Sequence, residues 1–334
     1  MVTAHAPIAS DIETLRTALS AARSEIAKAV RGQDETILLT LIGIISGGHV
    51  LLEGPPGTGK TLLVQSLHAA TGLDFARIQF TPDLMPADIT GGMTLVEDET
   101  GRPRVDYQKG PIFTQLLLAD EINRATPRTQ SALLEAMQDG AISHNGRTEQ
   151  LPQPFTVLAT QNPIEMEGTY TLPEAQVDRF MLRIEVKYPT PESLAEILIA
   201  TTGTEKPKLQ SVLTPEQILV LRALVRDMPV HSSIPLAVAK LATATQPGSP
   251  DSDAEANRIL RYGISPRGAQ SMLLGAKAHA FLAGRNHVAV EDLRAVMGPT
   301  LLHRLHARFE AKADPLAVTK LLNRLFDKHL GSIS

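Results

Sequence analysis

Residues 54–61 read Gly54-Pro55-Pro56-Gly57-Thr58-Gly59-Lys60-Thr61, which fits the pattern G-x-x-x-x-G-K-[ST]. A short apolar run, His49 to Glu53, precedes this segment, and a helical pattern from Thr61 to Ala70 follows it. The glycines allow backbone N–H groups to point inward around an anion, and the N-terminus of the following helix adds a positive partial charge. A strand, this loop and a helix in that order predict a phosphate-binding loop, or P-loop.

The P-loop predicts a site for ATP or ADP with Mg²⁺. Lys60 would reach the β- and γ-phosphates as a mobile point charge, and the Thr61 hydroxyl would bind the metal. The loop residues predicted to contact the nucleotide are Gly54, Pro55, Pro56, Gly57, Thr58, Gly59, Lys60, Thr61 and Leu62. A chance Gly/Pro turn before a helix is the alternative, and the strand and helix on either side disfavour it.

Further apolar runs alternate with helical patterns over the first 190 residues, at Arg77 to Phe80, Ile112 to Ala119 and Phe155 to Ala159. Such runs indicate a parallel sheet with helices on both faces, so the fold class is α/β. Parallel sheets of this kind bind ligands at the carboxyl ends of their strands. The P-loop, the pair Asp120-Glu121 and Asn162 all fall at predicted strand ends.

These strand-end residues predict hydrolysis. Asp120 would hold the magnesium through its water shell, and Glu121 would polarise the attacking water in line with the γ-phosphate. Asn162 would hydrogen-bond the γ-phosphate or that water. Its alternative is a loop asparagine that caps its own backbone. Adjacent acids are weak evidence alone, and the upstream P-loop makes them strong.

Two predicted β-hairpins interrupt the alternation of strands and helices. One pairs Met93 to Val96 with Arg104 to Tyr107 around a turn at Asp98 to Pro103. The other pairs Ala141 to Ser143 with Thr148 to Leu151 around an Asn-Gly turn. Neither hairpin is needed to complete the sheet, so both are candidates for a function outside the nucleotide site.

After residues 187–190 the sequence pattern predicts mainly helices. Thr190-Pro191, Thr214-Pro215 and Ser265-Pro266 each place a capping hydroxyl before a proline at the first helical position. Upstream, helices are predicted from Asp11 to Val30 and from after Gln33 to about Ile45. We therefore divide the chain into an α/β nucleotide-binding core at 1–190 and a helical domain at 191–334.

Composition limits the function further. The 334 residues carry 32 basic and 36 acidic side chains, a formal charge of 32 − 36 = −4, which disfavours general binding to polyanions. The chain has no cysteine, so it has neither disulfides nor a thiol nucleophile. No apolar run reaches the roughly 20 residues of a membrane span. Residues 1–11 lack the basic and apolar regions of a secretory signal, so we expect a cytoplasmic protein.

These motifs together resemble the AAA+ ATPases, and several longer strings resemble the MoxR family. They are QFTPDLMPADITG at 79–91, LLLADEINR at 116–124, TQSALLEAM at 129–137, ATQNP at 159–163 and LPEAQVDRF at 172–180. The likeness covers about residues 20 to 330 and is densest between 50 and 190. It implies an AAA+ core with β-hairpin insertions and a C-terminal all-α lid domain.

The resemblance also implies roles for single residues. Asn162 matches the sensor-1 residue, and Arg179 matches the arginine finger that enters the neighbouring subunit's ATP site. The alternative for Arg179 is a structural ion pair with Glu174 or Asp178. Arg267 matches sensor 2, acting on either its own or the neighbour's nucleotide. The segment Arg31-Gly32-Gln33 matches the one that lines the adenine, with Gly32 and Gln33 as contacts.

The resulting hypothesis is an ATPase that works as an oligomeric ring, a hexamer by resemblance, and remodels a protein client. The implied partner is a von Willebrand factor A (VWA) domain protein with a metal-dependent adhesion site. Hydrolysis would rotate the lid against the core about residues 187–191. The alternative is an AAA+ nucleic-acid motor or helicase loader, which the near-neutral charge and 4% aromatic content disfavour. A phosphotransferase and a nucleotide-binding scaffold without turnover rank lower, because Glu121 is present and no acceptor site is evident.

Overall fold

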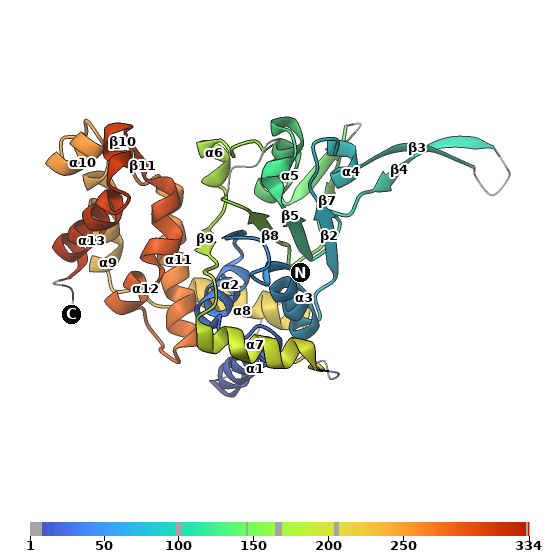
Figure 1. Ribbon diagram of the computed structural model, residues 1–334, viewed down its shortest axis with the longest axis horizontal. Helices are drawn as coiled ribbons and strands as arrows, with labels where there is room; N and C mark the ends of the chain where they lie inside the picture. The colour runs from blue at the N-terminus through green and yellow to red at the C-terminus, as the bar shows by residue number, and fades with distance from the viewer. Residues whose placement is uncertain are drawn as a thin grey trace.

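The computed structural model describes residues 9–97, 102–144, 146–163, 169–203, 207–331 and 333. At its centre lies a parallel five-stranded sheet with helices on both faces (Figure 1). The strand order is β2-β5-β8-β1-β9, formed by Phe75–Gln79, Leu116–Asp120, Thr156–Gln161, Val50–Glu53 and Leu182–Glu185. The predicted α/β class with a parallel sheet is confirmed.

Two separate hydrophobic cores lie on the two faces of the sheet. In β5, Leu116 and Leu118 belong to the core shared with helices α1 (Ala9–Ala29), α2 (Asp34–Ser46) and α3 (Lys60–Thr71). Leu117 and Ala119 belong to the core shared with α5 (Pro127–Asp139). Alternate residues of a strand point to opposite faces, so a strand buried on both faces is apolar throughout.

The edge strand β9 was not among the predicted strands. Only Leu182 and Ile184 are buried in it, whereas Arg183 and Glu185 face outward and are exposed. This alternation over four residues lacks the continuous apolar run that marked the other strands. The run from Ile112 also needs correction, since the strand begins only at Leu116 and Ile112 is buried in the preceding turn.

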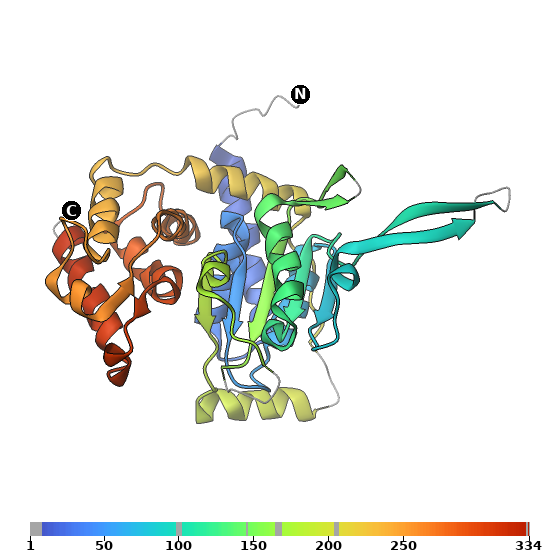
Figure 2. The ribbon, with the colours of Figure 1, turned by 90° about the horizontal axis from the view of Figure 1, so that it is seen from above.

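Both predicted hairpins are present. The first pairs β3 (Gly91–Glu97) with β4 (Pro103–Lys109), and the second pairs β6 (Ala141–His144) with β7 (Arg147–Gln150). Residues 98–101 of the first turn and Asn145 of the second lie outside the described residues. The β3–β4 ribbon extends far from the rest of the molecule beyond the β2 edge of the sheet (Figures 1 and 2).

The remaining elements are mostly helical, as predicted. They are α4 (Pro86–Thr90), η1 (Ile122–Arg124), α6 (Glu174–Val177), α7 (Pro191–Thr202), α8 (Pro215–Asp227), α9 (Ser233–Ala244), α10 (Ala254–Ile259), α11 (Pro266–Leu282), α12 (Val290–Leu301), η2 (Leu302–Arg304), η3 (Glu310–Ala313) and α13 (Ala317–Leu330). A two-stranded pair, β10 (Leu260–Tyr262) with β11 (His306–Ala307), is an addition that the helical patterning does not predict. Of the helices in the described residues, none combines the length and hydrophobicity needed to cross a bilayer.

The predicted caps form as expected. The Thr190, Thr214 and Ser265 hydroxyls each accept a hydrogen bond from a backbone N–H in the first turn of their helix. At Thr214 the Gln217 side chain also returns to the cap, which completes a capping box. These bonds explain where α7, α8 and α11 begin.

Helices α9 to α13 form a body beside the β9 edge of the sheet, whereas α8 lies against α2 (Figures 1 and 2). Arg222 of α8 donates to the Ile44 carbonyl (2.9 Å) and to Thr156 Oγ1 (2.7 Å) at the start of β8. These bonds join α8 to helix α2 and strand β8. The domain boundary between residues 190 and 191 stays a prediction.

His49 supplies a pH-dependent contact just before β1. Its Nδ1 accepts from the Val157 N–H (3.0 Å), so the ring proton lies on Nε2, which donates to the Met137 carbonyl (3.0 Å). The bond from Val157 requires the neutral ring, because a protonated Nδ1 cannot accept a hydrogen bond. Burial lowers the pKa of His49 to about 4, and the charge of Arg222 adds to that lowering.

We therefore expect His49 to destabilise the fold in mild acid. The unfolded chain binds the proton below about pH 6.5 and the folded chain only near pH 4, so stability falls between these values, by up to about 3 kcal/mol. In His49→Asn the free energy of unfolding, measured with urea from pH 7.5 to 4, should fall less steeply than in the unmodified protein. The same replacement at the exposed His287 is the control. Parallel curves for His49→Asn and the unmodified protein would contradict this assignment.

Candidate nucleotide-binding and hydrolysis site

The strand register places the P-loop and the predicted acids at one edge of the sheet. Glu53, the last residue of β1, lies opposite Gln161 of β8, and the Gly54 N–H donates to the Gln161 carbonyl (3.2 Å). In β5, Asp120 is the last residue and lies opposite Gln79 of β2. The P-loop, Asp120 and the residue after β8, Asn162, are therefore brought to the same carboxyl edge, as the sequence predicts.

The P-loop has the backbone of a phosphate cradle. Gly57 and Gly59 adopt left-handed φ values of 79° and 83°, a region that favours glycine. The Lys60 ammonium donates to the Gly54 (2.8 Å) and Pro55 (2.7 Å) carbonyls across the loop. Burial lowers the pKa of Lys60, and the charges of Asp120 and Glu121 act in the opposite direction. A lysine held over the loop, with two acids nearby, suits the binding of a phosphate group together with its metal ion.

Other predicted contacts surround this loop. The Gln33 amide donates to the Thr58 carbonyl (2.7 Å), so the 31–33 segment lies against the P-loop. Gly32 has a left-handed φ of 67°, and a Cβ there would lie 2.3 Å from Ser193 Oγ in α7. The 31–33 segment is thus enclosed between the loop and the start of α7. Leu62, by contrast, is exposed on the first turn of α3.

Asp120 is held by two residues that the sequence analysis did not single out. Thr160 Oγ1 donates to Asp120 Oδ1 (2.6 Å), and the Arg77 guanidinium donates to Oδ2 (2.7 and 3.1 Å). Asp120 is only 7% exposed, so these contacts define the direction of its carboxylate. Thr160 lies in the string ATQNP, but neither this string nor the residue type of Arg77 shows that the side chain contacts Asp120. Only the register places them here.

Glu121 has a distinctive conformation. Among the described residues it is the only non-glycine with a positive φ, 56°, a conformation that persists where the surroundings enforce it. Its N–H donates to Thr160 Oγ1 (2.8 Å), and its carboxylate Oε2 accepts from Gln79 (3.0 Å) and Arg124 (2.9 Å). Strand β2 and the short helix η1 therefore set the position of this carboxylate.

Thr160 connects the two acids, because its hydroxyl donates to Asp120 and accepts from the Glu121 N–H. Thr160→Val keeps the shape and removes both bonds. We expect a loss of about 1–3 kcal/mol in the free energy of unfolding and, because misplacing a catalytic group by about 1 Å can cost that much, a fall of about 10²-fold in ATP turnover. Thr156→Val in the same strand is the control for removing a hydroxyl. Equal effects on turnover of the two variants would contradict a positioning role.

Asn162 lies directly after β8 and is partly buried. Its carbonyl accepts from the Asn123 side-chain amide at 3.4 Å, which links it to the η1 segment after Glu121. Asn162 is therefore positioned beside Gly54 and close to the segment of Glu121. Its contact with the γ-phosphate or the water stays a prediction.

Arg179 lies at the opposite end of the sheet from the P-loop. The register pairs Val50 with Leu182, and the Met181 N–H donates to the His49 carbonyl (2.9 Å), so Arg179 is level with the residues before β1. The P-loop follows β1, and four strand residues alone span about 13 Å. The structure does not bring Arg179 to the P-loop of its own chain.

The ion pairs predicted as the alternative for Arg179 do not form in the described part of the chain. Glu174 pairs with His306 (3.4 Å), and Asp178 pairs with Arg304 (2.8 Å) and Arg267 (3.4 Å). The two arginines Arg179 and Arg267 instead line one small pocket with Met137 and Gln138. Two cations that line one pocket can contact an anionic group brought there from outside the chain.

The residues at the P-loop edge also fit a magnesium ion. Mg²⁺ keeps most of its waters and binds proteins through one or two carboxylates together with substrate phosphates. Thr61 and Asp120 supply a hydroxyl and one buried carboxylate beside the phosphate loop. Within the described residues, no group of three or more His, Asp or Glu side chains could hold a metal by itself. The donor set therefore suits a nucleotide-bound ion.

Family models match two parts of the chain. A model described as the ATPase family associated with various cellular activities (AAA) matches residues 49–182, and an AAA lid domain matches residues 252–324. The chain is also similar over 95% of its length to a solved structure from Cytophaga hutchinsonii. That match has a TM-score of 0.87 and 38% identity, and it covers 96% of the solved chain.

Curated relatives extend over most of the chain. Chaperone MoxR1 of Mycobacterium tuberculosis is 39% identical over 95% of this chain and 82% of its own length. Protein MoxR of Paracoccus denitrificans is 34% identical over 85% of this chain and 87% of its own. The P-loop, the strand-end acids and the helical lid agree with these relationships. The chain belongs to the MoxR family of AAA+ ATPases.

Proposed function

We propose that the protein hydrolyses ATP to ADP and phosphate at sites formed between two copies of the chain. The observation that carries this proposal is the register of β9 against β1, which separates Arg179 from the P-loop of its own chain. Hydrolysis by this family's chemistry needs a cation at the transferring phosphoryl group in addition to the lysine. A second copy can supply Arg179 to the P-loop edge of the first.

Each residue of the P-loop edge has a defined task. The backbone of residues 54–59 and Lys60 hold the triphosphate, while Gly32 and Gln33 line the adenine. Glu121 polarises the attacking water, and Asn162 orients that water or the γ-phosphate. Thr61 and Asp120 would hold Mg²⁺, which would neutralise part of the phosphate charge when bound.

Arg267 acts with Arg179 on the neighbouring copy's nucleotide. Two observations support this choice between the alternatives left open by the sequence. Arg267 lies 3.4 Å from the carboxylate of Asp178, the residue before Arg179, and both arginines line the same pocket. Because the Arg267 guanidinium contacts Asp178, it lies with Arg179 at the far end of the sheet from the P-loop of its own chain.

Because the P-loop of one copy would face Arg179 of the next, the contact between copies is head-to-tail, and repeated contacts of this kind form a ring where the rotation between copies closes. We propose a hexamer, by resemblance to the family. Rotation of the lid against the core about residues 187–191 would transmit hydrolysis to a client. The β3–β4 ribbon, which projects with Leu95 and Val105 exposed, is a candidate for contact with that client.

The proposed client is a protein, since a relative at 39% identity is named a chaperone. By family resemblance, the proposed partner is a VWA-domain protein. We place this activity in the cytoplasm, where ATP is abundant. Stimulation of the ATPase by DNA, with strong salt dependence, would favour the nucleic-acid motor instead.

The test is the ATPase rate per subunit as a function of protein concentration. A site shared between copies predicts a rate per subunit that rises with concentration and then saturates as rings form. The oligomeric state, measured by light scattering at the same concentrations, should rise in parallel. A rate independent of concentration in a monomeric protein would mean that one chain is a complete site.

A further inference from the structure

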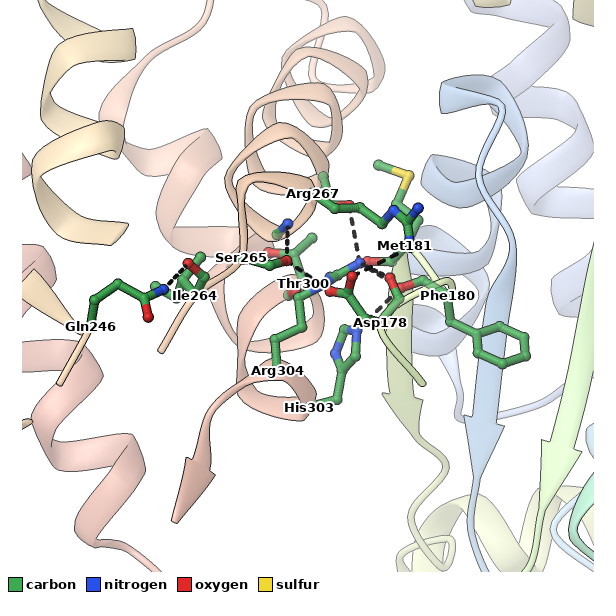
Figure 3. A network of polar contacts seen from close by, with 12 residues as sticks. Asp178, Phe180, Met181, Gln246, Ile264, Ser265, Arg267, Thr300, His303 and Arg304 are labelled. Carbon is green, nitrogen blue, oxygen red and sulfur yellow. Dashed lines mark hydrogen bonds and ion pairs between the residues drawn. The ribbon is translucent and has the colours of Figure 1, made fainter. Parts of the chain in front are cut away.

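Arg304 of η2, in the lid, has an unusual concentration of contacts with one short segment of the core (Figure 3). Its guanidinium donates to the carbonyls of Asp178 (2.9 Å), Phe180 (2.8 Å) and Met181 (3.3 Å). It also donates to Asp178 Oδ1 (2.8 Å). The bound segment, residues 178–181, contains Arg179. The carbonyls on both sides of the arginine finger are therefore held by one lid side chain.

Arg304 is 3% exposed. Burial of a guanidinium is costly unless its N–H groups are hydrogen-bonded. Here the acceptors are the Asp178 carboxylate, the Ser271 hydroxyl and the carbonyls of Asp178, Phe180, Met181 and Thr300. If residues 178–181 moved away from the lid, several of these donors would lose their acceptors. The position of residues 178–181 is therefore expected to depend on the position of the lid.

Three further lid groups hold the same segment (Figure 3). Ser265 Oγ, at the start of α11, donates to Asp178 Oδ1 (2.8 Å), and Arg267 lies 3.4 Å from Asp178 Oδ2. The buried His303 ring nitrogen Nε2 lies 3.2 Å from the Phe180 carbonyl. Two separate lid elements, α11 and η2, thus meet on the residues that flank Arg179.

The path of Arg304 leaves no room for a side chain at residue 268. A Cβ on Gly268 would lie 2.8 Å from Arg304 Cδ and 3.0 Å from Ile264 Cγ2. The Cδ atom belongs to a buried side chain tied at its far end, so it cannot move aside at low cost. Gly268 follows Arg267 directly. Arg304 therefore packs directly against the first turn of α11, which carries Arg267.

We propose that Arg304 is a positioning residue that fixes the Arg179 segment to the lid, so that the lid determines where the arginine finger lies at the neighbouring site. This proposal rests on the proposed function, in which Arg179 acts on another copy's ATP. A contact that only stabilised the fold would affect the copy that carries it. A positioning contact instead affects hydrolysis at the next copy's P-loop.

The test uses mixtures of two inactive variants. Arg304→Gln subunits keep their P-loop and acids, and Glu121→Gln subunits keep their Arg304 and Arg179. Alone, Arg304→Gln should lose about 10²-fold in turnover through a finger displaced by about 1 Å, with the KM for ATP unchanged. Addition of Glu121→Gln subunits should restore most of this loss, because they offer a correctly held finger to the intact P-loops.

The reference mixture is Arg179→Ala with Glu121→Gln. Recovery in both mixtures supports the proposal. Recovery in the reference alone would overturn the positioning role of Arg304 and leave the shared site intact. No recovery in the reference would show that Arg179 does not act between copies, and both proposals would fall.

A matched control is Arg222→Gln, because Arg222 also donates to backbone carbonyls, but those of Ile44 and Phe155 rather than those of residues 178–181. Any loss of activity in that variant should not be restored by Glu121→Gln subunits. If Arg304→Gln does not fold, as judged by its melting curve, Gly268→Ala takes its place. It leaves Arg304 present and displaces it, and the same recovery is expected.

Discussion

Arg179→Ala is expected to lower ATP turnover by about 10³–10⁵-fold, because a guanidinium at the transferring phosphoryl group stabilises the charge of the transition state. Binding of ATP should be little changed, since Arg179 is at the far end of the sheet from the P-loop of its own chain. The measurements are the steady-state ATPase rate and the Kd for a fluorescent ATP analogue.

Mixing Arg179→Ala subunits with unmodified subunits tests this prediction most directly. As Arg179→Ala subunits are added to the unmodified protein, the rate per unmodified subunit should fall, because some P-loops receive no finger. Arg324→Ala, which removes a lid arginine paired with Asp253 and Glu255, is the control and should not affect the rate. A rate indifferent to doping would mean that each chain is a complete site. The phosphotransferase interpretation would then gain weight.

Glu121→Gln is expected to lower turnover by about 10²–10⁴-fold, the contribution of a well-placed general base. The amide keeps the size of the side chain and can still contact Gln79 and Arg124, so the fold and the affinity for ATP should be retained. Single-turnover hydrolysis of prebound ATP measures the chemical step, and equilibrium binding measures affinity.

Glu291→Gln, at an exposed position in the first turn of α12, is the matched control and should leave turnover unchanged. A Glu121→Gln protein that hydrolyses prebound ATP at the original rate would disprove the role of Glu121. A variant that fails to bind ATP would instead indicate that the carboxylate holds the site together. The two outcomes are separated by the binding measurement.

Features encoded within a few consecutive residues could be predicted from the sequence. The P-loop needs only residues 54–61 with a strand before and a helix after, and both are present. The capping box of Thr214 and Gln217 is closed within four residues, so it could be identified before any fold was known. The Asn-Gly hairpin is equally local. Side-chain chemistry and backbone preference suffice for such elements.

Contacts between distant segments could not be predicted. Arg77, Gln79 and Thr160 surround Asp120 and Glu121 only because β2, β5 and β8 are aligned in one register. Gln79 and Thr160 lie in strings that resemble the MoxR family, but the strings do not show which acid each residue contacts. The edge strand β9 was missed for a related reason. One of its faces is exposed, so its signal in the sequence is too short and too polar.

The sequence by itself determined the family resemblance, the nucleotide loop and the edge of the sheet at which the acids lie, because these depend on local patterns and on one rule for parallel strands. The tertiary structure alone decided where the arginines lie relative to that edge. Arg304 and Asp178 are 126 residues apart, and their contact depends on how the lid packs beside β9. The parallel pairing of β9 with β1 then separates Arg179 from its own P-loop, since the residues before and after parallel strands lie at opposite ends of the sheet.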